Sequence, residues 1–257
     1  MQSPNSNLRA FTLAVTTLLT QPSQLLPHLT IPTITHLPEN LGPALIAPSP
    51  STTSTTSTTS TTSTNPTPHP PTPTIRALVL DKDNTLCHPK TTTFVPEILD
   101  KLHALRTSAT SPFRHDNSIL IVSNRAGSHP RYDAEIRSLE EKLGEMKLRI
   151  PVFVLPAGSE KKPFCGREVL EWFRERGVVE RADEIAVVGD RLGTDVLMAA
   201  AMGSWSVWCR DGVTEGARQM NLLEKMEVWV EGYLRGSRGL KAPLPRGWDA
   251  NHPASQE

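Results

Sequence analysis

An apolar run of strand length, residues 75–80, ends in two acids, Asp81 and Asp83, which are separated by one residue. Two carboxylates held at the end of one strand repel each other unless a cation or a proton lies between them. A carboxylate in such a place can act as a nucleophile or as a general acid and base. This spacing therefore indicates a charged site at the end of a strand.

Three further apolar runs are followed by polar side chains that can bind charge. They are Ser123 and Asn124 after residues 118–122, Lys162 after residues 151–155, and Asp190 and Asp195 after residues 184–188. Taken singly, an acid there can cap a helix, a Ser-Asn pair can form a turn, and a lysine can lie in solvent. Their occurrence after four successive runs favours one shared site.

The elements that must position these residues alternate between strand and helix. The expected strands are residues 75–80, 118–122, 151–155, 184–188 and 205–209, and the expected helices are residues 96–106, 130–146, 163–176, 194–202 and 215–234. Apolar strands that alternate with helices predict a Rossmann-like α/β fold, with a parallel sheet of about five strands and helices on both faces. Because ligands bind at the carboxyl ends of such strands, all four sets should meet at one edge.

The motifs "DKDNT", "VSN", "KKP" and "GDRLGTD" together resemble those of the haloacid dehalogenase-like phosphohydrolases, over residues 75–209. The resemblance implies that Asp81 is the nucleophile and that Asp83 is the general acid and base. Ser123 and Lys162 complete the implied catalytic set by holding the phosphoryl oxygens. An acid at position 83 indicates phosphate rather than halide chemistry.

The same resemblance implies Mg²⁺ as cofactor, a hard cation that prefers oxygen ligands. Asp81, the backbone carbonyl of Asp83, and Asp190 would hold it, and Asp195 would orient Lys162 or a metal-bound water. The implied substrate-binding residues are Ser123, Asn124, Lys162, Arg125 and Arg191. The two arginines can equally be surface residues without a partner.

Relatives of this class differ in the cap domain, which is inserted between the motifs and covers the active site. About 40 residues separate Asp83 from Ser123, and about as many separate Ser123 from Lys162. The predicted strands and helices fill both intervals, so we expect no cap domain. An open site suits a phosphate on something large, such as a lipid head group, a protein or a nucleic acid.

The local sequences "ALVLDKDNTL", "IVSNRAG", "KKPFC" and "VVGDRLGTDVLMA" are similar to those of the mitochondrial phosphatidylglycerophosphate phosphatases of fungi and plants, and of bacterial YqeG-type proteins. This resemblance implies hydrolysis of phosphatidylglycerophosphate to phosphatidylglycerol, for cardiolipin synthesis. It also implies a peripheral protein at the matrix face of the mitochondrial inner membrane. The sequence departs from the pattern at Thr85, where cysteine is common, and in a Ser/Thr/Pro-rich run.

Two other functions stay open on the residues alone. One is a phosphatase of the same class that acts on a soluble ester, such as a sugar phosphate or histidinol phosphate, or on a polynucleotide end. The other is a non-catalytic binding module with the same fold. The intact set of acids favours an enzyme.

Composition excludes several alternatives. The 257 residues contain 27 basic and 27 acidic side chains, and this neutral balance does not indicate a nucleic-acid partner. The three scattered cysteines, Cys87, Cys165 and Cys209, form no disulfide framework. No run reaches the roughly 20 apolar residues that span a bilayer, so a phospholipid substrate would have to be met at a membrane surface. The sequence does not indicate protein partners.

The chain divides by composition into four parts. We expect an N-terminal segment (1–47), a disordered Ser/Thr/Pro-rich linker (48–74), a phosphatase domain (75–240) and a C-terminal tail (241–257). The first segment can be a mitochondrial targeting sequence or a short helix packed on the domain. The linker can alternatively be a phosphorylated or glycosylated stalk.

The final predicted helix carries a broad apolar stripe. It comprises Leu222, Leu223, Met226, Trp229, Val230, Tyr233 and Leu234. Core packing is the favoured interpretation, because Glu224, Glu227 and Glu231 on the same helix would be repelled by anionic lipid. The basic residues after this helix are the alternative lipid contact.

Overall fold

The computed structural model describes residues 6–47, 72–127, 129–156, 159–214 and 220–248. Most of the predicted linker and the end of the predicted tail lie outside these residues. The division into segment, linker, domain and tail therefore stays a prediction.

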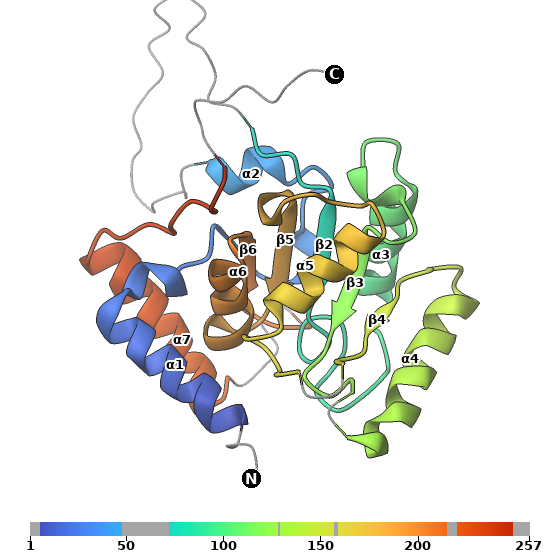
Figure 1. Ribbon diagram of the computed structural model, residues 1–257, viewed down its shortest axis with the longest axis horizontal. Coiled ribbons are helices and arrows are strands. Elements are labelled where there is room, and N and C mark those ends of the chain that lie inside the picture. The colour runs from blue at the N-terminus through green and yellow to red at the C-terminus, as the bar shows by residue number, and fades with distance from the viewer. Residues whose placement is uncertain (1–5, 48–71, 128, 157–158, 215–219, 249–257) are drawn as a thin grey trace, which may run out of the picture.

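A single parallel sheet forms the centre of the molecule (Figure 1). Its strands are β1 (Leu29–Ile31), β2 (Ala77–Leu80), β3 (Ile119–Val122), β4 (Val152–Phe153), β5 (Ile185–Gly189) and β6 (Trp205–Cys209). Their order across the sheet is β1-β6-β5-β2-β3-β4. The parallel α/β fold is confirmed, with six strands where we expected about five.

The additional strand, β1, comes from the N-terminal segment. Leu29 pairs with Val207 and Ile31 with Cys209, in parallel register with β6. The His28 ring anchors the start of β1, because its Nδ1 lies 2.9 Å from the Ser206 hydroxyl. A strand of three residues is too short to show a period of two, so sequence pattern alone could not predict it.

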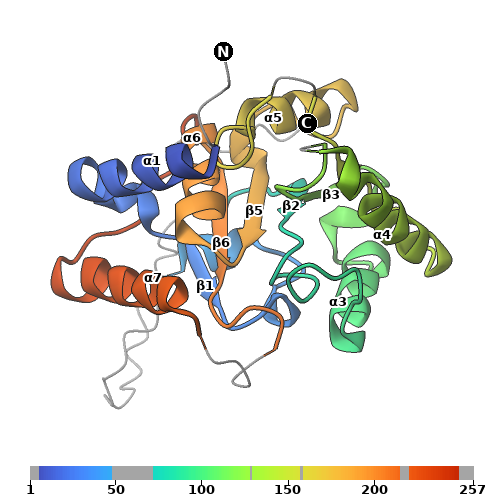
Figure 2. The ribbon, with the colours of Figure 1, turned by 90° about the horizontal axis from the view of Figure 1, so that it is seen from below.

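Side chains of the strands alternate between two core layers. Leu78 and Leu80 of β2 face the layer that includes α2 (Gly42–Ile46), α3 (Pro96–Thr107) and α4 (Asp133–Glu145). Ala77 and Val79 face the layer that includes α5 (Gly166–Glu175) and α6 (Leu197–Met202) (Figure 2). Both faces of the sheet are therefore covered, which explains why its strands are apolar throughout.

Short 3₁₀ turns connect several elements, at residues 22–25, 34–36, 112–114, 130–132 and 182–184. Between Asp83 and Ser123 the main element is α3, and between Ser123 and Lys162 the described residues form α4 and β4. No cap domain lies in the described part of these two intervals, as expected.

Two helices, α1 (Ser6–Thr20) and α7 (Leu222–Gly232), lie at the β1–β6 side of the sheet and are separated from each other in the view of Figure 2. The predicted helix at 215–234 begins at Leu222, where Asn221 caps it by accepting a hydrogen bond from the backbone N–H of Glu224 (3.0 Å); residues 215–219 lie outside the described part. A π-helical turn, Tyr233–Ser237, follows α7. Among the described residues, none of the helices combines the length and the hydropathy that a bilayer-spanning helix needs.

The favoured interpretation of the α7 stripe was wrong. Leu222 is 79% exposed, Trp229 67% and Met226 48%, whereas Leu234, beyond the helix, is buried. Hydrophobic periodicity shows that a helix has an apolar face but does not show what covers that face.

Candidate active site

The four predicted sets of polar residues lie at the carboxyl edge of the sheet. Asp81 directly follows β2, and its backbone N–H donates to the Val188 carbonyl of β5 (2.9 Å). Asp190 directly follows β5, and its carbonyl accepts a hydrogen bond from the Trp208 indole of β6 (2.9 Å). The sheet thus holds the two acidic loops next to each other.

Three buried carboxylates and one buried ammonium form the centre of the site. Asp81, Asp190 and Asp195 each offer an oxygen within 4.8 Å of the others. The Lys162 ammonium forms ion pairs with Asp81 and with Asp195, the latter at 2.6 Å. Asn84 donates to the Asp190 carboxylate (2.6 Å). Sequence reasoning gave Asn84 no role, because an Asn after a strand usually indicates a turn.

The charges of this cluster do not balance. Burial raises the pKa of Asp81 well above its ordinary value; Lys162 opposes this, and Asp195 and Asp190 add to it. Burial and Asp195 raise the pKa of Asp190 to about 7. Burial alone would lower the pKa of Lys162, but the Asp195 and Asp81 carboxylates raise it. Three carboxylates around one ammonium carry excess negative charge, so this donor set fits a divalent metal ion.

The backbone after β5 is shaped to hold Asp195. A Cβ atom added to Gly189 would lie 2.3 Å from the Asp195 Cγ, so only glycine fits there. The π-helical turn Leu192–Val196 then returns the Asp195 carboxylate to the Arg191 N–H (3.2 Å). The Asp195 carboxylate is thereby held where it pairs with the Lys162 ammonium (2.6 Å); its expected role, to orient Lys162 or a metal-bound water, stays a prediction.

Asp83 lies outside the buried cluster. Its carboxylate is 31% exposed, lies 3.1 Å from the Lys82 ammonium, and accepts a hydrogen bond from the Lys90 N–H (2.9 Å). An acid at the solvent side of the site can exchange protons with a leaving group or with water. Its expected metal contact through the backbone carbonyl stays a prediction.

A second polar network, which sequence reasoning missed, supports the loop after β2. The Lys82 side chain is fully buried and donates to the Thr91 carbonyl (2.9 Å) and to Glu135 of α4. Arg125 also binds Glu135, at 2.6 Å. Arg125 is therefore a paired residue, and no local signal in the sequence connects Glu135 with this loop.

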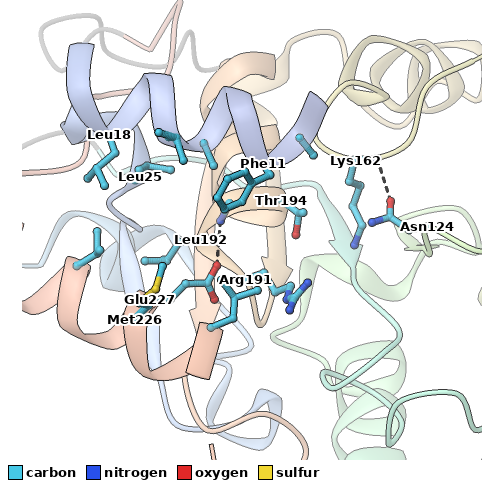
Figure 3. A pocket seen from close by; sticks show the side chains of 16 residues that line it. Phe11, Leu18, Leu25, Asn124, Lys162, Arg191, Leu192, Thr194, Met226 and Glu227 are labelled. Carbon is cyan, nitrogen blue, oxygen red and sulfur yellow. Dashed lines mark hydrogen bonds between the residues drawn. The ribbon is translucent and has the colours of Figure 1, made fainter. Parts of the chain in front are cut away.

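The other expected substrate-binding residues follow β3 and β5 at the same edge of the sheet. Ser123 is buried at the end of β3, and its hydroxyl accepts a hydrogen bond from the Arg125 N–H (3.2 Å). Asn124 accepts a hydrogen bond from the Lys162 backbone N–H (2.9 Å), which places the two side by side (Figure 3). Arg191 lines the pocket that opens here.

This pocket, of about 430 Å³, leads from Asn124 and Lys162 to the space between α1 and α7 (Figure 3). Phe11 and Leu18 of α1 form part of one wall, and Met226 of α7 forms part of another. Sequence reasoning did not place α1 in the site. A short helix packed on the domain was one of two interpretations of the N-terminal segment, and it did not indicate which surface such a helix would cover.

Glu227 of α7 lies in the same pocket and gives a prediction for stability. Burial raises the pKa of Glu227 from 4.5 to about 7, and the Asp195 carboxylate adds to this shift. The backbone N–H groups of Gly193 and Leu192 and the Arg191 guanidinium oppose it. Between these two pH values the folded chain holds a proton that the unfolded chain has lost, so stability falls as pH rises through this window.

A glutamine at position 227 cannot ionise. The Glu227→Gln variant should therefore match the wild type in melting temperature near pH 5 and exceed it by about 2–4 °C at pH 8. Thermal unfolding followed by circular dichroism at both pH values measures the difference. An equal difference at pH 5 and pH 8 would show that ionisation of Glu227 plays no part.

The parallel sheet carries Asp81, Ser123, Lys162 and Asp190 at its carboxyl edge. This fold and this set of residues define a haloacid dehalogenase-like phosphatase. Within this class, the family model described as mitochondrial PGP phosphatase matches residues 8–214, and the chain belongs to that family. The match begins inside α1, so the N-terminal helix is part of the family pattern.

Curated relatives agree with this assignment. The mitochondrial phosphatidylglycerophosphatase GEP4 of Saccharomyces cerevisiae is 40% identical over 153 residues, which are 59% of this chain and 76% of the relative. A probable mitochondrial phosphatidylglycerophosphatase of Schizosaccharomyces pombe is 32% identical over 162 residues, 61% of this chain and 68% of the relative.

One solved structure also aligns with the chain. It comes from Lactobacillus delbrueckii subsp. bulgaricus and bears the name of a phosphoglycolate phosphatase. The alignment covers 53% of each chain at 20% identity with a TM-score of 0.35. The fold assignment rests on the sheet topology and not on this similarity.

Proposed function

We propose that the chain is a Mg²⁺-dependent phosphatase that converts phosphatidylglycerophosphate to phosphatidylglycerol through an aspartyl-phosphate intermediate. The observation that carries the proposal is the buried Asp81 carboxylate beside the Lys162 ammonium. Family membership and the names of the relatives support the substrate.

In the first step, an Asp81 oxygen attacks phosphorus and the bond from phosphorus to the glycerol oxygen breaks. Lys162 and the Ser123 hydroxyl hold the phosphoryl oxygens as charge develops on them. Asp83 gives its proton to the departing alkoxide, which leaves as the alcohol of phosphatidylglycerol. Its partial exposure suits this role.

In the second step, the ionised Asp83 takes a proton from water. The resulting hydroxide attacks phosphorus, the bond to the Asp81 oxygen breaks, and inorganic phosphate leaves. Both carboxyl groups then have their starting protonation states, so the cycle needs no other reactant.

Asp81, Asp190 and the Asp83 carbonyl would hold Mg²⁺, and Asp195 would keep Lys162 in place. The bound ion supplies charge that reduces the repulsion between the anionic nucleophile and the anionic phosphate. The excess negative charge of the cluster supports this set.

A chelator should therefore stop the reaction. We expect EDTA to lower phosphate release by about 100-fold or more, because several kcal/mol of charge stabilisation are lost, and excess Mg²⁺ to restore it. Mg²⁺ should also raise the melting temperature of the wild type, but not that of Asp190→Asn. Asp116→Asn, at a 56% exposed acid, is the matched control. Full activity in EDTA would contradict the metal role.

The substrate is tested with a panel of phosphomonoesters under the same conditions. We expect phosphatidylglycerophosphate in mixed micelles to be preferred over sugar phosphates, histidinol phosphate and a phosphorylated polynucleotide end. A soluble ester preferred by orders of magnitude would overturn the lipid substrate. No hydrolysis of any member would favour a binding module.

We further propose that the enzyme works as a peripheral protein at the matrix face of the mitochondrial inner membrane, within cardiolipin biosynthesis. The mitochondrial names of both relatives support the organelle. Fractionation of mitochondria with carbonate extraction tests the location, since a peripheral protein is released from the membrane pellet.

A further inference from the structure

The pocket beside Lys162 continues as a groove between α1 and α7, which we call the helix groove. Its polar lining comprises Asn124, Lys162, Arg191, Thr194 and Glu227, and most of the remaining lining is apolar. The apolar part includes Phe11, Val15 and Leu18 of α1 and Leu223, Met226 and Val230 of α7. The helix groove is thus polar where it meets the phosphate site and apolar away from it (Figure 3).

Exposed apolar side chains gather along the same two helices. Nine of the eleven large hydrophobic residues exposed in the described part of the chain belong to α1, to α7 or to the turn after α7. They are Leu8, Phe11, Val15, Leu19, Leu222, Leu223, Met226, Trp229 and Tyr233. Such clustering, unlike scattered exposure, marks an interaction surface.

Contacts at both helices tie the groove walls to neighbouring segments of the domain. Arg9 of α1 forms an ion pair with Glu160 and lies 5.0 Å from the centre of the Phe164 ring, so α1 is tied to the segment that carries Lys162. Gly193 donates its N–H to Glu227 of α7 (3.2 Å). The two walls are therefore connected to the elements that build the phosphate site.

The acids of α7 do not oppose an anionic surface as the sequence suggested. Glu224 is 8% exposed and accepts a hydrogen bond from the Asn221 N–H (2.9 Å). Glu227 faces the pocket, and Glu231 pairs with Arg235 (2.7 Å). Each carboxylate is engaged within the protein, which leaves the exposed part of α7 mainly apolar.

We propose that the helix groove holds the glycerol backbone and upper acyl chains of a membrane phospholipid whose terminal phosphate lies at Lys162, while the exposed side chains of α1 and α7 enter the bilayer surface. This inference rests on the proposed function and adds where the lipid lies. The gradient from charged to apolar along one continuous groove matches an amphiphile. A second copy of the chain is a poorer occupant, because its binding at this face would not require a groove that continues to Lys162.

The test removes apolar character from both walls with the double variant Phe11→Asp/Met226→Asp. Both side chains are about half exposed, at 57% and 48%, so the fold should tolerate the change. Leu244→Asp, at an apolar residue that is 59% exposed and outside the groove, is the matched control. Each protein is assayed on phosphatidylglycerophosphate in vesicles and on water-soluble p-nitrophenyl phosphate.

We expect the ratio of the two kcat/KM values, lipid over soluble ester, to fall by about ten-fold or more in the double variant and to stay constant in the control. Sedimentation with phosphatidylglycerol-containing vesicles should show the same loss of binding. Trp229 provides a direct probe: vesicles should shift its emission to shorter wavelength, and Trp229→Phe should remove that shift.

The outcomes separate this inference from the proposed function. If the double variant hydrolyses the lipid with an unchanged ratio of the two kcat/KM values, the groove does not bind the lipid, and the proposed substrate stands. If vesicle binding needs Phe11 and Met226 but the protein hydrolyses no lipid phosphate, the membrane-binding surface stands and the proposed substrate is wrong. A double variant that only changes an oligomer to a monomer in ultracentrifugation shows that copies of the chain cover this face, which overturns the inference.

Discussion

The Asp81→Asn variant should release phosphate at least about 10⁴-fold more slowly than the wild type, because a carboxamide cannot form the aspartyl-phosphate intermediate. The change keeps the size of the side chain and leaves Lys162 its ion pair with Asp195 (2.6 Å). We therefore expect a folded protein, with a melting temperature near that of the wild type. Phosphate release from phosphatidylglycerophosphate in mixed micelles with Mg²⁺ is the measurement.

Asp116→Asn serves here too as the matched control, because it makes the same chemical change at an exposed acid that pairs with Arg106 and lies outside the carboxylate cluster. It should keep wild-type activity. Turnover by Asp81→Asn within ten-fold of the wild type would remove Asp81 as the nucleophile. Acid quenching of the wild type during turnover and mass spectrometry of all its peptides would then show which residue carries the phosphoryl group.

The Lys162→Met variant should lose both activity and stability. Methionine fills similar space without charge, so the transferred phosphoryl group loses a cation, which we expect to lower kcat by about 10²–10³-fold. Asp81 and Asp195 are also left buried without their common partner, and breaking such a pair costs about 3–5 kcal/mol. Denaturant unfolding without metal measures this loss, and Mg²⁺ should partly reverse it.

Lys161→Met is the natural control, because the neighbouring lysine is only partly buried and lies outside the carboxylate cluster. Lys162→Arg retains the charge but not the shape, so it should recover stability more than activity. A fully active Lys162→Met would exclude this lysine from phosphate binding. A fully stable one would show that the buried acids hold protons rather than need a cation.

The parts of the fold that could be predicted are those encoded by local pattern. Strands β2 to β6 are short apolar runs, and the motifs after β2, β3, β4 and β5 lie where the parallel arrangement requires. The placement of Asp81, Lys162, Asp190 and Asp195 follows from this, because parallel strands bring their carboxyl ends to one edge.

The parts that could not be predicted depend on contacts between distant segments. Strand β1 is recognisable only by its pairing with β6. The fully buried Lys82 is held by Glu135 on another element, and no spacing rule connects residues 53 positions apart. The apolar face of α7 was visible in the sequence, but only the structure shows that α1 and α7 both line the pocket beside Lys162.

The position of α1 and β1 has a consequence for how the chain can be divided. Both elements precede the Ser/Thr-rich run, yet one borders the pocket and the other completes the sheet. A recombinant protein that started at residue 72 would keep every motif acid and still lose a groove wall, and it would leave β6 as a bare sheet edge open to aggregation. A single cut within residues 48–71 would instead yield two pieces that still share one sheet. For this chain, the smallest functional unit is therefore larger than the segment that carries the motifs.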